Sequence, residues 1–124
     1  MIEITSHFVL IRPKLIQEAL LLQKITYIPI GAEEFACKSK VSLDQTPQRD
    51  DRGDVWMQRF RAVTADCSVR QHDGANRYVG VIMSDGSIRI IGSPGEAPII
   101  TVTPGDQGMS VVETTFETTE PLDL

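Results

Sequence analysis

Short β-branched runs separated by Gly, Pro and Asp turns restrict the fold of this chain from residue 55 onward more than any other feature. The clearest two runs cover residues 78–83 and 88–91, and Asp85 and Gly86 lie between them. Asp-Gly between apolar runs is a strong β-hairpin signal, because both residues tolerate positive φ angles. The sequence therefore predicts an antiparallel hairpin here.

The register of this hairpin depends on the length of its loop. A two-residue loop at Asp85-Gly86 would place Met83 opposite Ile88 and Val81 opposite Ile90. Because side chains alternate along a strand, these four residues and Val79 are expected to share one face. The opposite face would then carry the remaining side chains, Ile82, Arg89 and Ile91.

Three more stretches, residues 55–63, 99–103 and 109–119, are also predicted as strands. In the first, Trp56, Phe60 and Ala62 fall on one side. The last alternates regularly and predicts one face exposed to water. Its two faces would carry Val112, Thr114, Phe116 and Thr118 on one side and Val111, Glu113, Thr115 and Glu117 on the other.

The first half of the chain is less regular. The polar stretch 44–54 is expected to be an exposed loop. Pro13 could open a helix over residues 14–24, although the same residues would also suit buried strands; we favour a short helix or turn near 14–19 and a strand near 20–30. The predicted fold is mainly β: a single-domain antiparallel sandwich or small barrel over residues 1–124, with at most one short N-terminal helix.

The charge distribution bears on the class of partner. The net charge is −5, and residues 90–124 hold six acids and no Lys or Arg. That part would repel a phosphate backbone, so no nucleic acid is expected as a partner. No window holds the roughly 18 consecutive apolar residues that a membrane helix needs. The first residues lack the basic, then apolar, pattern of a signal peptide, and cytoplasmic synthesis is expected.

No catalytic motif is present around the two histidines, His7 and His72, and no enzyme activity is expected. A His72 or His7 that converged with carboxylates in a deep pocket would reverse that expectation. Cys37 and Cys67 are interpreted as reduced, partly buried thiols, and whether they pair is left open.

The polar stretch holds several weak binding signals. Its aspartates could supply oxygen ligands for Ca²⁺, but their spacing does not match a calcium loop, and no metal or other cofactor is expected. Arg52-Gly53-Asp54 matches a cell-attachment tripeptide and is interpreted as a solvated turn. Arginines beside Trp56 and Phe60 could favour nucleic-acid stacking, but core packing of the two rings is preferred. The residues concerned are Asp44, Asp50, Asp51 and Asp54 for the metal, and Arg49, Arg52, Arg59 and Arg61 for the nucleic acid.

The order of features over residues 55–124 resembles small β-rich proteins encoded in phages and prophages of Bacteroides-type bacteria. The matching stretches are Ile90-Ile91-Gly92-Ser93-Pro94 with Pro98-Ile99, and Thr114-Thr115-Phe116 with Pro121-Leu122. The resemblance is a pattern of strands and turns and contains no catalytic signature. It implies a structural component of a virion or tail-like particle, present in many copies in a ring.

We therefore expect a non-enzymatic structural protein of phage or prophage origin that acts through self-assembly. Its partners would be copies of itself or other particle proteins, with no membrane involved. The contact surface is expected to include the strand 109–119, in particular Val111, Glu113, Thr115 and Glu117. The alternative is a host-encoded β-fold binding module that recognises a protein or a small ligand.

Overall fold

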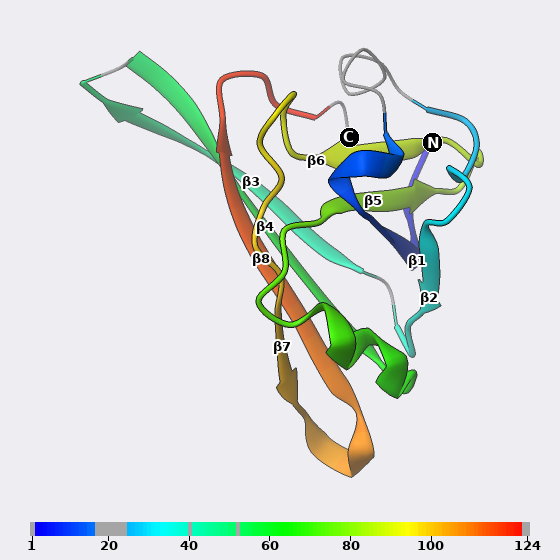
Figure 1. Cartoon of the computed structure of the whole chain (residues 1–124). Helices are drawn as coiled ribbons and strands as arrows, with labels where there is room; N and C mark the ends of the chain where they lie inside the picture. The colour runs from blue at the N-terminus through cyan, green and yellow to red at the C-terminus, as the bar shows by residue number, and fades with distance from the viewer. Residues whose placement is uncertain (1, 17–24, 40, 52, 123–124) are drawn as a thin grey trace.

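In the described residues, eight strands form two four-stranded antiparallel sheets that pack face to face (Figure 1). The structure is a computed structural model, and it describes residues 2–16, 25–39, 41–51 and 53–122. The predicted mainly β sandwich is confirmed. The first sheet has the order β2-β1-β5-β6, with β1 (Ile4–Ile11), β2 (Glu33–Ala36), β5 (Tyr78–Met83) and β6 (Ile88–Ile91). The second sheet has the order β3-β4-β8-β7, with β3 (Ser42–Asp50), β4 (Gly53–Thr64), β7 (Thr101–Pro104) and β8 (Ser110–Thr118).

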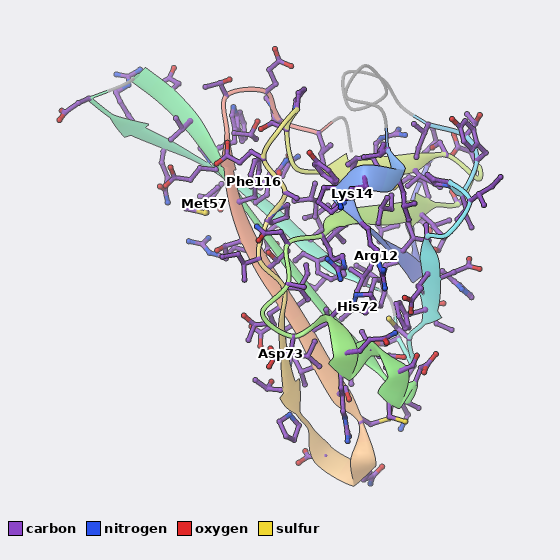
Figure 2. All side chains as sticks on the ribbon, in the orientation of Figure 1. Arg12, Lys14, Met57, His72, Asp73 and Phe116 are labelled. Atoms are coloured by element: carbon purple, nitrogen blue, oxygen red, sulfur yellow. The ribbon has the colours of Figure 1, made fainter. Side chains whose placement is uncertain are left out.

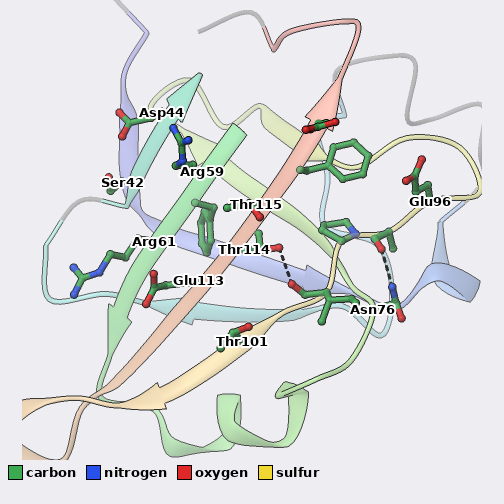
Figure 3. Close-up of a pocket in the computed structure, with 16 residues that line it drawn as sticks. Ser42, Asp44, Arg59, Arg61, Asn76, Glu96, Thr101, Glu113, Thr114 and Thr115 are labelled. Atoms are coloured by element: carbon green, nitrogen blue, oxygen red, sulfur yellow. Dashed lines mark hydrogen bonds between the residues drawn. The ribbon is translucent and has the colours of Figure 1, made fainter. Parts of the chain in front are cut away.

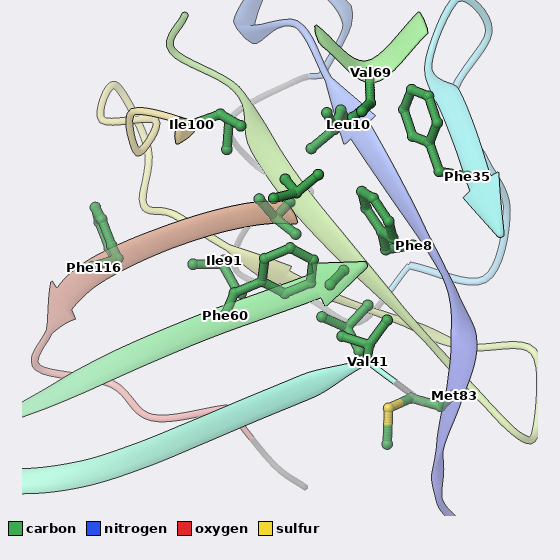
Figure 4. Packing of buried hydrophobic residues seen from close by; sticks show 14 residues of the cluster. Phe8, Leu10, Phe35, Val41, Phe60, Val69, Met83, Ile91, Ile100 and Phe116 are labelled. Carbon is green, nitrogen blue, oxygen red and sulfur yellow. The ribbon is translucent and has the colours of Figure 1, made fainter. Parts of the chain in front are cut away.

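The main core lies between the two sheets, where aromatic rings from three strands meet (Figure 4). The ring of Phe8 on β1 lies 5.4 Å from that of Phe35 on β2 and 5.3 Å from that of Phe60 on β4. Such pairs add to the free energy gained by burying their apolar surface. The rings therefore join both sheets through one side chain, that of Phe8.

A second apolar cluster covers the outer face of the first sheet. It contains Val9, Ile11, Ile16, Ile25, Tyr78, Ile88 and Ile90. A short 3₁₀ helix, η1 (Pro13–Leu15), and the chain around Ile25 adjoin this face. β1 is consequently buried on both faces, which explains its unbroken apolar run from Phe8 to Ile11. Neither β1 nor β2 was predicted from the sequence.

The predicted β5–β6 hairpin exists, but its predicted register was wrong by one residue. The loop holds three residues, Ser84, Asp85 and Gly86, because Met83 and Ser87 pair through their backbones. The Asp85 carboxylate accepts hydrogen bonds from the N–H and hydroxyl of Ser87, and Gly86 takes the positive φ of 85° that closes such a loop. The resulting pairs are Val79 with Ile91, Gly80 with Ile90, Val81 with Arg89 and Ile82 with Ile88.

This shift changes which side chains face the main core. Ile91 and Arg89 share the core face with Val79 and Val81, whereas Ile88 and Ile90 belong to the outer cluster. A one-residue slip reverses the direction of every side chain on the second strand. The prediction that Ile88 and Ile90 share a face with Val79 and Val81 is therefore corrected.

The polar stretch 44–54 is a hairpin rather than a loop. β3 and β4 pair from Ser42–Arg61 to Asp50–Gly53, and their far end extends beyond the sandwich (Figure 1). β3 is an edge strand, so polar side chains there remain in water without loss of stability. The expected exposure is confirmed for Asp44 and Arg49, but the expected absence of a strand is wrong.

Polar side chains replace apolar packing at the inner side of this hairpin. Gln58 is buried and donates a hydrogen bond from Nε2 to Oε1 of Gln45. Gln45 in turn binds the backbone of Leu122 twice, through Nε2 to its carbonyl and through Oε1 from its N–H. These bonds satisfy the buried amides and hold the chain near its C-terminal end against β3 and β4.

Between β1 and β2, the described residues contain less regular structure than predicted. The expected helix or turn near 14–19 appears as the single turn η1, with residues 17–24 outside the described residues. The described part of the expected strand 20–30 contains only one isolated bridge, between Ile25 and Ile88. The strand prediction is wrong there, because Pro29 and Gly31 turn the chain.

The predicted strands 55–63, 99–103 and 109–119 correspond to β4, β7 and β8. Between β4 and β5 lies a 3₁₀ helix, η3 (Cys67–His72), and a shorter one, η4 (Asp106–Gly108), precedes β8. Asp66 caps η3, since its carboxylate accepts hydrogen bonds from the N–H and hydroxyl of Ser68. These bonds lower the pKa of Asp66 below its ordinary value.

Candidate functional site

An open groove of about 920 Å³ runs along β8 (Figure 3). One wall is the outer face of the second sheet, where Asp44, Arg59 and Arg61 project from β3 and β4. The other wall is the segment 96–99, which crosses the side of the sandwich before β7. The groove therefore combines a strand surface with a loop that comes from a different direction.

The groove exists because β7 covers only part of β8. The ladder between the two strands ends at the pair Thr101–Glu113, so in the described structure residues 114–118 pair only with β4. Before Thr101 the chain turns toward residues 74–77 instead. Four hydrogen bonds hold it there: Arg77 N–H to Pro98 carbonyl, Ile100 N–H to Ala75 carbonyl, Gly74 N–H to Ile100 carbonyl, and Asn76 Nδ2 to Ala97 carbonyl.

One side-chain bond closes the inner end of the groove. The hydroxyl of Thr114 donates to the carbonyl of Ile99 at 2.8 Å. This contact satisfies a carbonyl that has no partner strand, and it fixes Ile99 with its side chain directed outward, 60% exposed. The rim of the groove therefore presents an exposed aliphatic side chain beside carboxylates.

Three of the four residues predicted for interaction lie in this groove. Glu113, Thr115 and Glu117 line it and are exposed, as the alternation along β8 predicted. Val111 does not line it and is only 9% exposed, because the backbone at Gly105 packs against its side chain. The structure thus brings together the predicted acidic face but not its apolar member.

Asp44, Arg59 and Arg61, considered above for a metal or a nucleic acid, line the groove together with Glu96 and Ile99, which were not predicted as site residues. Arg59 lies opposite Asp44 on one side and Thr115 on the other, and Arg61 lies opposite Glu113. Opposite charges in directly paired positions stabilise a sheet modestly. Because Trp56 and Phe60 were expected on one side of this strand, its alternation places Arg59 and Arg61 on the other side. No local signal placed Glu96 or Ile99 beside them.

His72 is the most deeply buried titratable side chain described, at 1% exposure. Its Nδ1 accepts a hydrogen bond from Nε of Arg77 at 3.1 Å. The Nε2 of His72 lies 3.2 Å from Oε1 of Glu33 but has no hydrogen bond of good geometry. The Gln71 amide donates to both oxygens of the same carboxylate.

These contacts give His72 a structural role. Glu33 belongs to β2, and Gln71 and His72 belong to η3, so the cluster fastens η3 to the edge of the first sheet. Neither His72 nor Glu33 lines the groove. A substrate could not reach the imidazole in this conformation, since the ring is packed edge-on against Phe35. The histidine–carboxylate pair therefore lies between η3 and β2, away from the groove.

The remaining candidates are separate from one another. His7 Nδ1 lies 3.8 Å from Oε1 of Glu34, with both side chains about half exposed. Nε of Arg49 lies 3.0 Å from Asp54 at the end of the β3–β4 hairpin, whereas Asp44 is in the groove. Arg52 lies outside the described residues. In the part of the chain that the structure describes, no three His, Cys, Asp or Glu side chains form a group that could hold a metal ion.

The two cysteines are free thiols in different surroundings. Cys67 is exposed, whereas Cys37 is partly buried, and this burial raises the pKa of the Cys37 thiol against a smaller opposing effect of a backbone hydrogen bond with Val63. Because the thiolate is the reactive form, we expect iodoacetamide at pH 8 to label Cys67 several times faster than Cys37.

Mass spectrometry of the native protein checks this prediction, with urea-unfolded protein as the control in which both thiols react. Cys67→Ser should leave only slow labelling. Equal labelling rates for both cysteines in the native protein would contradict the burial of Cys37.

No protein-family model, curated protein or solved structure matches this chain. Among the described residues, no helix is both long and apolar enough to cross a membrane.

Proposed function

We propose that this chain is a non-enzymatic structural subunit that acts by self-association. The observation that carries the proposal is the open groove along β8, whose surface combines exposed charges of both signs with the 60% exposed side chain of Ile99. Exposed aliphatic surface next to patterned charge is typical of protein contact sites. In an isolated monomer this exposed surface remains in water and adds nothing to the stability of the fold.

The two sheets differ in a way that supports contact through the second one. The first sheet has apolar clusters on both faces. The outer face of the second sheet carries Asp44, Arg59, Arg61, Glu113 and Glu117. Charges that alternate in this way fix the register of an interface more than they add affinity. Subunits that must assemble in one orientation need such a surface.

The setting of this assembly is proposed from the resemblance to phage and prophage proteins. A virion or tail-like particle is built from many copies of small β-rich subunits, and a subunit of this kind needs no catalytic group. The buried, structural position of His72 agrees with that proposal. The protein would be made in the cytoplasm and then join the particle with copies of itself or with other particle proteins.

A binding module remains the second candidate because of the size of the groove. Its volume of about 920 Å³ is within the range of roughly 300–1,000 Å³ that is common for small-ligand pockets. Its lining includes Phe116 and the hydroxyls of Thr114 and Thr115. A monomer whose thermal stability rises with one class of small ligand would favour this candidate over self-association.

Self-association is tested by light scattering after size exclusion across a hundredfold range of concentration. We expect the solution mass to rise to multiples of the 13.7 kDa chain as concentration increases. Carbonic anhydrase, measured on the same column, controls for concentration-dependent artefacts. A constant monomer mass at the highest concentration would contradict the proposal.

A further inference from the structure

We propose that copies of this chain join head to tail, with the groove along β8 of one copy binding a basic apolar surface around η1 of the next copy. This inference rests on the proposed self-association and names its interface. The second surface, called the η1 patch, consists of Arg12, Lys14, Leu15, Tyr27, Ile28 and Ile30.

The η1 patch exposes more large apolar side chains than any other described surface. Leu15 is 38% exposed, Tyr27 55%, Ile28 41% and Ile30 95%. Leu15 lies against the backbone of Gly31, where a Cβ atom would come within 3.1 Å of its Cδ1. Leu15 and Gly31 therefore adjoin, which places η1 beside the turn at residues 29–32.

Two tight turns contain Leu15 and Ile30. The N–H of Leu15 donates to the carbonyl of Arg12 at 2.9 Å, and the N–H of Ala32 donates to the carbonyl of Pro29 at 3.1 Å. Arg12 and Lys14 are exposed on the first turn and give the η1 patch positive charge. An apolar surface with basic side chains at its edge is electrostatically complementary to an apolar surface with acidic side chains at its edge.

The groove has that complementary character. Its lining carries four carboxylates against two arginines, and Ile99 stands exposed on its rim. Glu113 lies on β8, and Glu96 lies on the opposite wall, so the acidic groups flank the groove on both sides. The carboxylates are Asp44, Glu96, Glu113 and Glu117, and the arginines are Arg59 and Arg61.

The two surfaces are centred on different sheets, although Ala97 of the groove wall also packs against the outer cluster of the first sheet. The η1 patch is mounted on the outer cluster of the first sheet, through Ile11, Ile16 and Ile25. The groove belongs to the outer face of the second sheet and its β7 side. Figure 2 shows Arg12 and Lys14 over the first sheet, apart from Phe116 on β8.

Contact between two unlike surfaces restricts the symmetry of the assembly. A two-fold dimer needs the same patch on both copies, whereas a groove-to-patch contact leaves one groove and one patch free at the ends. Addition of further copies then produces a ring if the rotation closes and a filament if it does not. The proposed interface therefore predicts a mass well above that of a dimer.

The experiment uses two charge-reversed variants of the full chain. Variant A is Glu96→Lys with Glu113→Lys in the groove, and variant B is Arg12→Glu with Lys14→Glu in the η1 patch. In each variant the two surfaces have the same charge sign, so we expect the mass to fall to that of a monomer in low salt. In an equimolar mixture, each groove faces a patch of opposite charge again, and the oligomer should return.

The matched control is Asp106→Lys with Glu120→Lys, which makes the same charge change as variant A at exposed acids outside the groove lining. It should retain the wild-type mass. Glu113→Lys places a cation opposite Arg61 and could weaken the sheet. Ile30→Asp, at a side chain that is 95% exposed, provides a second test that does not affect the core.

The outcomes separate this inference from the proposed function. An oligomeric wild type whose mass is unchanged in variants A and B, and in Ile30→Asp, overturns the interface and leaves self-association standing. Two monomeric variants that do not assemble on mixing also overturn it, since the surfaces would then not contact each other. A monomeric wild type overturns both proposals. Return of the oligomer only in the mixture supports the interface.

Discussion

Phe8→Ala is expected to lower the free energy of unfolding by about 3–5 kcal/mol, the largest effect of any single substitution proposed for this chain. Phe8 is fully buried, and its ring contacts those of Phe35 and Phe60. Its removal leaves a cavity where both sheets meet, and the surrounding strands can close it only in part. Since the total stability of a small domain is about 5–15 kcal/mol, this is a large fraction.

Urea unfolding at one fixed protein concentration measures this effect, because self-association would also contribute to apparent stability. Ile2→Ala is the matched control, since Ile2 is 46% exposed and should change stability by no more than about 0.5 kcal/mol. If Phe8→Ala does not fold, Phe8→Leu should still show a loss of about 1–3 kcal/mol. A loss as small as that of Ile2→Ala would contradict the assigned core.

Gly80→Ala is expected to cost about 1–3 kcal/mol, although it adds only one methyl group. A Cβ atom at Gly80 would lie 2.4 Å from Cγ2 of Val9 and 2.8 Å from Cγ2 of Ile88. Both neighbours are β-branched side chains in the outer cluster of the first sheet, and both are buried. They can move only by disturbing that cluster, so the added methyl group strains the centre of the sheet.

A double-mutant cycle with Val9→Ala tests whether this cost has the proposed origin. Val9→Ala alone should destabilise by roughly 1–3 kcal/mol, because it removes two buried methyl groups. The double variant should be more stable than the sum of the two single losses predicts, by at least about 0.5 kcal/mol, since Val9 no longer occupies the space. Strict additivity would show that the two side chains do not compete, and would refute the packing assigned to Gly80.

The parts of the fold that could be read from the sequence are those with local alternation. β8 has one wet and one buried face, and its side chains lie as predicted from Val112 to Thr118. β1 has no alternation of apolar and polar residues from Phe8 to Ile11, because its successive side chains face two different apolar clusters. β3 was missed for a different reason. A polar edge strand has the composition of an exposed loop, so its sequence predicted a loop. The predicted β5–β6 register failed because Asp85 binds Ser87 and lengthens the loop by one residue.

In the candidate site, too, residues that alternate along one strand could be predicted, and residues positioned by distant contacts could not. Outward-facing Glu113, Thr115 and Glu117 could be predicted from the period of β8. The wall with Glu96 and Ile99 could not, because its position depends on hydrogen bonds to residues 74–77, which lie far away in the sequence. The η1 patch was missed for a related reason. Ile28 and Ile30 lie within the predicted strand 20–30, which the described residues do not form, and so they were expected to be buried.

The order of the strands in the two sheets also restricts how a newly synthesised chain can fold. β1 and β2 leave the ribosome early, but the first sheet lacks its centre until β5 has been made, and the second sheet waits for β8. Among the described strands, β1 with β2 and β3 with β4 can pair between neighbours in the sequence before then. Loops must close over most of the chain before the apolar run at Phe8–Ile11 is covered on both sides, which slows folding and leaves that run open to chaperones in the meantime.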